Sequence, residues 1–162
     1  MRRFRDSARD ALRGIASAVN SGRNLRIQMT VGAYALLAAP VMLRNASEWA
    51  AVLAVIGLVM SLEIINTAIE FVCEHVSGSY APYIRLAKDA AAGGVLLAVI
   101  FAVGVGALFY LRPHRLLGFL DFCLDNVYYP ILLVVLLIPA AFFIVYGPRR
   151  IWQRWKGRKR RH

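Results

Sequence analysis

The sequence predicts an all-α membrane protein, with an N-terminal amphipathic surface helix, three membrane spans and a fourth transmembrane helix. Of its 162 residues, 59% are hydrophobic and 18% charged, and the mean hydropathy of +0.56 exceeds what a soluble domain of this length needs. The charges are confined to the two ends and to short gaps between apolar runs. At ~20 residues a span, this length holds four spans and no separate soluble catalytic domain.

The N-terminal segment, residues 1–26, is predicted to form an amphipathic helix on the membrane surface. Its apolar residues recur at helical spacing between arginines and aspartates: Phe4, Ala8, Leu12, Ile15 and Val19. A secretory signal would need an uninterrupted apolar core, which this segment lacks. Interfacial helices have this mixture of one apolar and one charged face.

Four apolar runs follow, each able to cross a hydrocarbon core of ~30 Å at ~1.5 Å per residue. They are residues 27–43, which reaches this length only marginally, 49–72, 90–111 and 127–147.

The net charge of +11 alone would suggest nucleic acid, but this hydrophobicity argues against a nucleic-acid partner. The basic ends are expected to contact anionic lipids, with Trp152 and Trp155 as interfacial anchors.

Basic residues predict the orientation, since Lys and Arg near span ends stay on the cytoplasmic side. Seven lie in the N-terminal segment, two between residues 73 and 89, and eight in the tail from Arg149; the remaining three lie in the other two gaps. Both termini and the middle loop are therefore expected in the cytoplasm, which requires an even number of spans.

The second apolar run carries polar residues on one helix face. At 100° per residue, Glu63, Asn66, Glu70 and Glu74 fall within an arc of roughly 80°. We call these four residues the polar stripe. Counted from Trp49, Glu63 is ~21 Å and Glu70 ~31 Å into the span, within reach of a cytoplasmic nucleotide. Carboxylates within a span are costly, so the stripe indicates a functional site; the alternative is a structural hydrogen-bond network between helices.

Lys88 and Asp89 come just where the third apolar run begins. A lysine and an aspartate at a helix start suit contacts with phosphate and metal. Taken alone they would equally suit an interfacial anchor and a helix cap, but the neighbouring stripe favours a role in binding.

These residues resemble the small integral-membrane lipid kinases of bacteria, diacylglycerol kinase and undecaprenol kinase, over roughly residues 4 to 111. The resemblance is carried by Glu63-x-x-Asn66-Thr67-Ala68-Ile69-Glu70, Ala87-Lys88-Asp89-x-Ala91-Ala92-Gly93-x-Val95-Leu96-Leu97, Glu48-Trp49, Arg13-Gly14 and Asn24-Leu25-Arg26-Ile27. It implies an interfacial helix (residues 1–26) and a three-span kinase-like core (residues 27–111). The additional span with a polybasic cytoplasmic tail (residues 112–162) lies outside the usual three-span body of the family. The residues of these motifs look more like those of the undecaprenol kinase branch than those of the diacylglycerol kinase branch.

The resemblance also implies ATP-dependent phosphorylation of a membrane lipid hydroxyl at the bacterial inner membrane, by a homotrimer with sites shared between protomers. Glu63 would be the general base, Asn66 would orient the hydroxyl, and Glu70 would bind Mg²⁺. The positions matching cofactor-binding residues are Lys88, Asp89, Glu74 and Arg13. Phosphoryl transfer needs mainly positioning and charge neutralisation, with a carboxylate to accept the hydroxyl proton.

The chain departs from the family pattern at Gly22, where the family has a second metal-binding Glu. One carboxylate fewer weakens a magnesium site, which Glu74 or Asp10 would have to supplement. Two functions therefore stay open: an active lipid kinase, or a catalytically impaired kinase-like protein that binds lipid or nucleotide or serves as an assembly subunit. A transporter is a distant third, because only one span carries ionisable groups.

Small residues recur every four positions on the third apolar run, at Ala90, Gly94, Ala98, Ala102 and Gly106. Such a stripe lets another helix approach closely, although Ala and Gly are also common in membrane spans. We expect it to make a helix contact within the three-span core. The fourth span is expected to pack around the outside, so truncation after Pro113 should leave activity unchanged.

Overall fold

The computed structural model describes residues 2–76 and 82–159, and within these ranges all secondary structure is helical. The helices are α1 (Arg2–Ser21), α2 (Arg23–Met42), α3 (Ala46–Val76), α4 (Pro82–Tyr110), α5 (Pro113–Asp125) and α6 (Tyr128–Lys159). Four segments are long and apolar enough to cross a membrane: Arg23–Met42, Ala46–His75, Pro82–Tyr110 and Tyr128–Pro148. The predicted all-α class and the four spans are confirmed.

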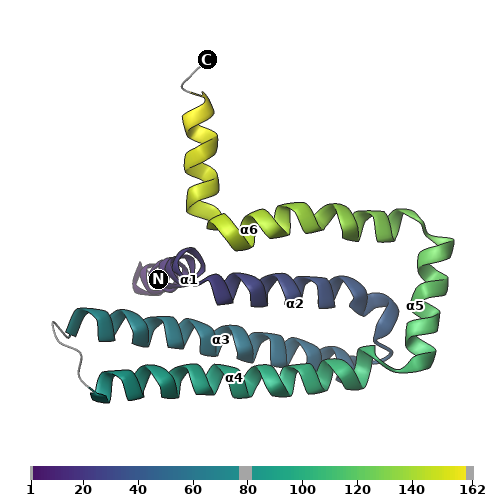
Figure 1. Ribbon diagram of the computed structural model, residues 1–162, viewed down its shortest axis with the longest axis horizontal. Helices are drawn as coiled ribbons and strands as arrows, with labels where there is room; N and C mark the ends of the chain where they lie inside the picture. The colour runs from purple at the N-terminus through teal and green to yellow at the C-terminus, as the bar shows by residue number, and fades with distance from the viewer. Residues whose placement is uncertain (1, 77–81, 160–162) are drawn as a thin grey trace.

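The four spanning segments run alongside one another (Figure 1). α3 packs against α4 on one side and α2 on the other, and α6 packs against α2. Most large apolar side chains of α4 and α6 are exposed, as expected for helices that face lipid.

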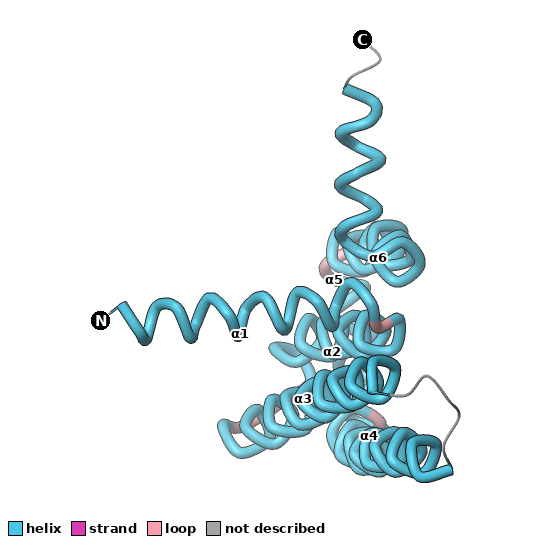
Figure 2. The backbone as a smooth tube through the Cα atoms, turned by 90° about the vertical axis from the view of Figure 1, so that its left-hand side faces the viewer, coloured by secondary structure: helices cyan, strands magenta, loops and turns pink. Residues whose placement is uncertain are grey.

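α1 lies crosswise to the bundle at one end of it (Figure 2), the position expected of a surface helix. It ends because Gly22 takes an extended conformation, with φ −83° and ψ 111°, and its backbone N–H donates to the Ala18 carbonyl at 2.7 Å. α2 then starts at Arg23 in the new direction. Two apolar residues along α1, Phe4 and Leu12, are 81% and 66% exposed.

The structure corrects the boundary of the third span. α4 begins at Pro82, eight residues before the expected start at Ala90, because the polar segment 82–89 is helical too. Proline suits the first turn of a helix, where its missing N–H has no intrahelical partner. Lys88 and Asp89 are therefore the seventh and eighth residues of α4, two turns into the helix and not at its N-terminus.

The segment expected as a connection, residues 112–126, contains the helix α5, which begins at Pro113. Arg115 fixes α5 to the rest of the protein. Its Nη2 lies 2.7 Å from Glu48 Oε1, and its Nη1 donates to Glu48 Oε2 at 3.0 Å and to the Met42 carbonyl at 3.1 Å. The Glu48 carboxylate raises the pKa of Arg115 above its ordinary value, so this buried pair stays charged.

α6 is attached to the core at several points. Tyr34 donates a hydrogen bond to the Leu133 carbonyl at 3.0 Å, and the Tyr129 hydroxyl donates to the Leu37 carbonyl. α6 bends at Gly147, whose φ of 66° and ψ of 164° interrupt the helix. The expectation that this span packs on the outside is confirmed: α6 lies against α2 and α1, and most of its large apolar side chains are exposed.

The small-residue stripe of α4 is divided between two environments. Ala98 is buried, and Ala102 and Gly106 are half-buried, on the side of α4 that faces the rest of the core. Ala90 and Gly94 are exposed, and a Cβ on Gly94 would meet nothing within 4 Å. The expected contact within the protomer therefore involves only the second half of the stripe.

Candidate functional site

The polar stripe begins inside the protein on α3. Glu63 is 4% exposed, Asn66 7% and Thr67 4%, although α3 is apolar along most of its length. The Thr67 hydroxyl donates to the Glu63 carbonyl one turn earlier, at 2.9 Å, so this side chain is satisfied by its own helix. Burial of a carboxylate and an amide on one helix face requires partners from elsewhere.

Those partners come from α2 and from α3 itself. Gln28 Nε2 donates to Glu63 Oε2 at 3.4 Å, which joins the first turns of α2 to the middle of α3. Asn66 Nδ2 donates to Glu70 Oε1 at 3.3 Å. Three residues of the predicted stripe, Glu63, Asn66 and Glu70, thus occupy one continuous polar surface.

Two oxygen atoms of this surface have no hydrogen-bond partner. Gln28 Oε1 and Asn66 Oδ1 are both buried and unpaired among the described residues. A buried acceptor without a donor costs about 1–3 kcal/mol, and such groups are scarce unless a ligand or ion completes them. Next to the carboxylates of Glu63 and Glu70, they make this surface rich in unused oxygen ligands.

The start of α2 lies beside the stripe. A Cβ on Gly22 would be 3.6 Å from Thr67 Oγ1 and 3.1 Å from the Ala18 carbonyl oxygen. A longer side chain at position 22 would therefore begin next to the polar face of α3. By the resemblance described above, a carboxylate would be expected at this position.

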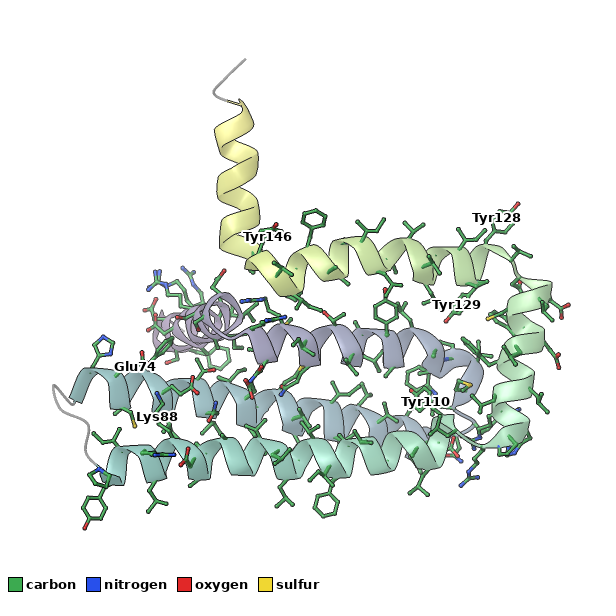
Figure 3. The ribbon with its side chains drawn as sticks, viewed as in Figure 1. Glu74, Lys88, Tyr110, Tyr128, Tyr129 and Tyr146 are labelled. Atoms are coloured by element: carbon green, nitrogen blue, oxygen red, sulfur yellow. The ribbon has the colours of Figure 1, made fainter. Side chains whose placement is uncertain are left out.

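The other predicted site residues lie outside this cluster. Glu74 and Lys88 face each other between α3 and α4, with Lys88 Nζ 3.7 Å from Glu74 Oε1 (Figure 3). Asp89 is exposed and lies 3.7 Å from Arg85 Nε, and Arg13 is exposed on α1, 3.4 Å from Asp10. Exposed pairs of this kind contribute little to stability, so the charges are accessible to a ligand.

Arg26, which the sequence presents as a basic charge before the first span and as part of the family motif, is 6% exposed and joins three helices. Its Nη1 donates to the carbonyls of Val19 and Asn20 in α1, at 2.8 and 3.1 Å, and its Nε donates to the Ile144 carbonyl of α6 at 3.0 Å. Arg26 thus holds the last turn of α1 and the end of the fourth span beside the start of α2. Hydropathy and spacing contain no signal for these long-range contacts.

The geometry suits a magnesium ion that arrives with a nucleotide. Among the described residues, no three His, Cys, Asp or Glu side chains gather as a closed metal cage. Magnesium is usually held by one or two carboxylates and substrate phosphates, with water completing its shell. Glu70 is a carboxylate that could serve as one such ligand, with the phosphates and water completing the shell.

Comparison with known proteins agrees with this arrangement. The family model for prokaryotic diacylglycerol kinase matches residues 9–110, which end with α4. A diacylglycerol kinase of Synechocystis is 41% identical over 108 residues, which are 66% of this chain and 62% of that protein. An undecaprenol kinase of Bacillus subtilis is 31% identical over 111 residues, which are 68% of this chain and 90% of that protein.

No solved structure matches the chain. α5 and α6 lie beyond the matched residues, whereas the polar stripe, Gln28 and Lys88 all lie within them. The match covers well over half of the sequence and includes every residue of the candidate site, so the chain belongs to the prokaryotic diacylglycerol kinase family.

Proposed function

We propose that this protein is a lipid kinase that transfers the terminal phosphate of ATP to the hydroxyl of a membrane lipid, undecaprenol or diacylglycerol. The observation that carries the proposal is the buried Glu63, placed beside Asn66 and Glu70 on a membrane-spanning helix. A carboxylate in that position costs several kcal/mol by most estimates, and ionisable residues within spans generally serve a function. The names of the relatives support a kinase acting on a lipid.

In this proposal Glu63 is the general base. Its carboxylate accepts the proton of the lipid hydroxyl while the hydroxyl oxygen forms a bond to the terminal phosphorus and the bridging oxygen of ATP leaves with ADP. Gln28 fixes the orientation of the carboxylate, and Asn66 orients the hydroxyl. A positioned base contributes about 10²–10⁴-fold to such a step.

Glu70 holds Mg²⁺ in the proposed enzyme. When bound, the ion neutralises the charge of the phosphates during transfer. Lys88 and Asp89 contact the nucleotide, and so do Glu74 and Arg13. Support comes from the ion pair that Lys88 of α4 makes with Glu74, which lies one turn after Glu70 on the same face of α3.

The site is assigned to the cytoplasmic side of the bacterial inner membrane. α1, the start of α4 and the bend of α6 lie at the same end of the bundle (Figure 1), and the segments at this end hold 15 of the 18 Lys and Arg residues that the structure describes. The basic segments contact anionic lipids. A homotrimer is proposed from the resemblance, and the exposed Gly57 and Gly94 leave room for a second copy.

A second function is favoured by Gly22. Because no carboxylate occupies this position beside Thr67, the protein is alternatively a kinase-like membrane protein that binds lipid or nucleotide without efficient transfer, or an assembly subunit. Nucleotide binding with no phosphorylated lipid would distinguish this function from the first.

Phosphate transfer by the purified full-length protein tests the proposal. Labelled ATP and Mg²⁺ are supplied with either undecaprenol or diacylglycerol, and a labelled lipid is expected from at least one. Glu63→Gln should abolish it, whereas Asp121→Asn, an exposed carboxylate of α5, should behave as wild type. Folded wild-type protein that labels neither lipid would refute the kinase and leave the second function.

A further inference from the structure

An apolar groove of about 580 Å³ follows α3 between α2 and α4. Val52, Ile56 and Val59 of α3 line it, with the small residues Ala35 of α2 and Gly106 of α4 among its walls. Its volume is in the range of binding sites for small organic ligands. Nothing in the kinase chemistry described above uses this groove.

The groove leads directly to the proposed base. Val52, Ile56, Val59 and Glu63 follow one another at spacings of four, three and four, so they share one face of α3. Gln28 lines the inner end of the groove and donates the hydrogen bond to Glu63. This face of α3 is therefore apolar along the groove and ends at a carboxylate. A lipid with an apolar chain and a terminal hydroxyl requires these two surroundings in this order.

At the opposite end, one hydrogen bond crosses the groove. The Tyr110 hydroxyl donates to the Ala35 carbonyl at 2.9 Å, so that α4 and α2 are joined across the groove. Tyr110 lies at the end of α4 remote from Lys88 (Figure 3). The two walls of the groove, α2 and α4, both pack on α3 and are joined to each other by a hydrogen bond. A helix with its side chains is about 10 Å wide or more, so a helix is too wide to enter the groove. An extended hydrocarbon chain is narrow enough.

We propose that this groove holds one apolar chain of the lipid acceptor while the hydroxyl lies at Glu63, and that Gly106 determines which chains fit. The proposal rests on the proposed function, since it is the acceptor that the kinase would phosphorylate. The second chain of a diacylglycerol lies outside the groove, among the membrane lipids.

Gly106 and Gly104 provide a matched pair of positions on α4. A Cβ on either glycine would meet nothing within 4 Å, but only Gly106 lines the groove, whereas Gly104 is exposed. Leucine at either position adds the same side chain to the same helix, so differences between the two variants report on the groove.

The first experiment measures KM for long and short acceptors: dioleoylglycerol against dihexanoylglycerol, and undecaprenol against geraniol. Gly106→Leu should raise KM about tenfold for the long acceptor that the wild type uses, the loss expected when about two methylene groups leave apolar surroundings. KM for ATP and for the short acceptor should not change, because a short chain ends before Gly106. Gly104→Leu should match wild type throughout.

The second experiment needs no catalysis. Dioleoylglycerol with a photoreactive group at a chain end is crosslinked to each protein without ATP, and the adducts are mapped. Adducts on groove residues are expected in wild type and Gly104→Leu, but not in Gly106→Leu. If these adducts formed and the same protein transferred no phosphate in the activity assay, the groove proposal would be supported and the kinase proposal refuted.

Three results would overturn the groove proposal. One is an active kinase whose adducts lie elsewhere, and another is an equal KM for the two leucine variants. The third is loss of the oligomer in Gly106→Leu alone, which would assign the groove to a second copy of the chain.

Discussion

Replacing Gly147 by alanine tests whether the fourth span holds the surface helix against the candidate site. Gly147 has φ 66° and ψ 164°, a conformation essentially restricted to glycine. A Cβ there would lie 3.2 Å from Arg26 Nη1. The same nitrogen donates to the carbonyls of Val19 and Asn20, so displacing Arg26 would loosen α1 as well as α6.

The expected cost has two parts. A non-glycine residue in this backbone region costs about 1–3 kcal/mol. Weakening one hydrogen bond from the buried guanidinium adds about 1.5–3 kcal/mol when the bond is lost entirely, and less when Arg26 shifts. The free energy of unfolding of Gly147→Ala should therefore fall by about 2–5 kcal/mol. Kinase activity should fall with it, because α1 and Gly22 lie beside the polar face of α3.

Equilibrium unfolding by SDS in mixed micelles, followed by tryptophan fluorescence, measures this change. Gly118→Ala is the matched control, since Gly118 lies inside α5 and a Cβ there meets nothing within 4 Å. Alanine in a helix interior should stabilise the protein by about 0.5–1 kcal/mol. If Gly147→Ala were as stable and as active as Gly118→Ala, the proposed link through Arg26 would be refuted. In that case truncation after Pro113 should also leave activity unchanged, as expected from the sequence.

Three further predictions concern the site and the small-residue stripe. Glu70→Gln and Glu63→Gln should both abolish transfer, but raised Mg²⁺ or Mn²⁺ should partly restore only Glu70→Gln; equal rescue in assays of rate against metal concentration would contradict the separate roles. Gly22→Glu should lower the Mg²⁺ concentration needed for half-maximal activity, and an unchanged magnesium titration would mean that another ligand serves. Ala98→Leu should destabilise the protomer by about 1–3 kcal/mol because Ala98 is buried, whereas Gly94→Leu, at an exposed site, should disturb only the oligomer; crosslinking and unfolding would separate the two effects.

The spans and the surface helix could be predicted because their signals are local. A run of apolar residues long enough to cross a bilayer needs no knowledge of its neighbours, and neither does the alternation of Phe4, Leu12 and other apolar residues with charges in α1. The grouping of Glu63, Asn66 and Glu70 was equally accessible, since helical geometry alone puts them on one face. Their roles in catalysis remain predictions.

Other features depend on pairing between distant segments. α5 was missed because a short helix between two spans has no long apolar run, and its Pro113 was not used as an indication of a helix start. Lys88 was placed at a helix terminus because polar residues before a span look like a loop. The contacts of Arg26 with Ile144 and of Arg115 with Glu48 could not be predicted, since these partners are 118 and 67 residues away along the chain.

The pairing of Glu48 with Arg115 imposes an order on folding during synthesis. Glu48 is made 67 residues before its partner, which at ordinary rates of translation is roughly 3–13 s. During that interval the guanidinium that neutralises the carboxylate does not yet exist, whereas Arg44, whose backbone N–H donates to Glu48 Oε2 in the finished structure, has already been made. The residues that match the family end at 110, so they too are complete before Arg115 is added. The Glu48 carboxylate therefore lacks its guanidinium partner until α5 has been made.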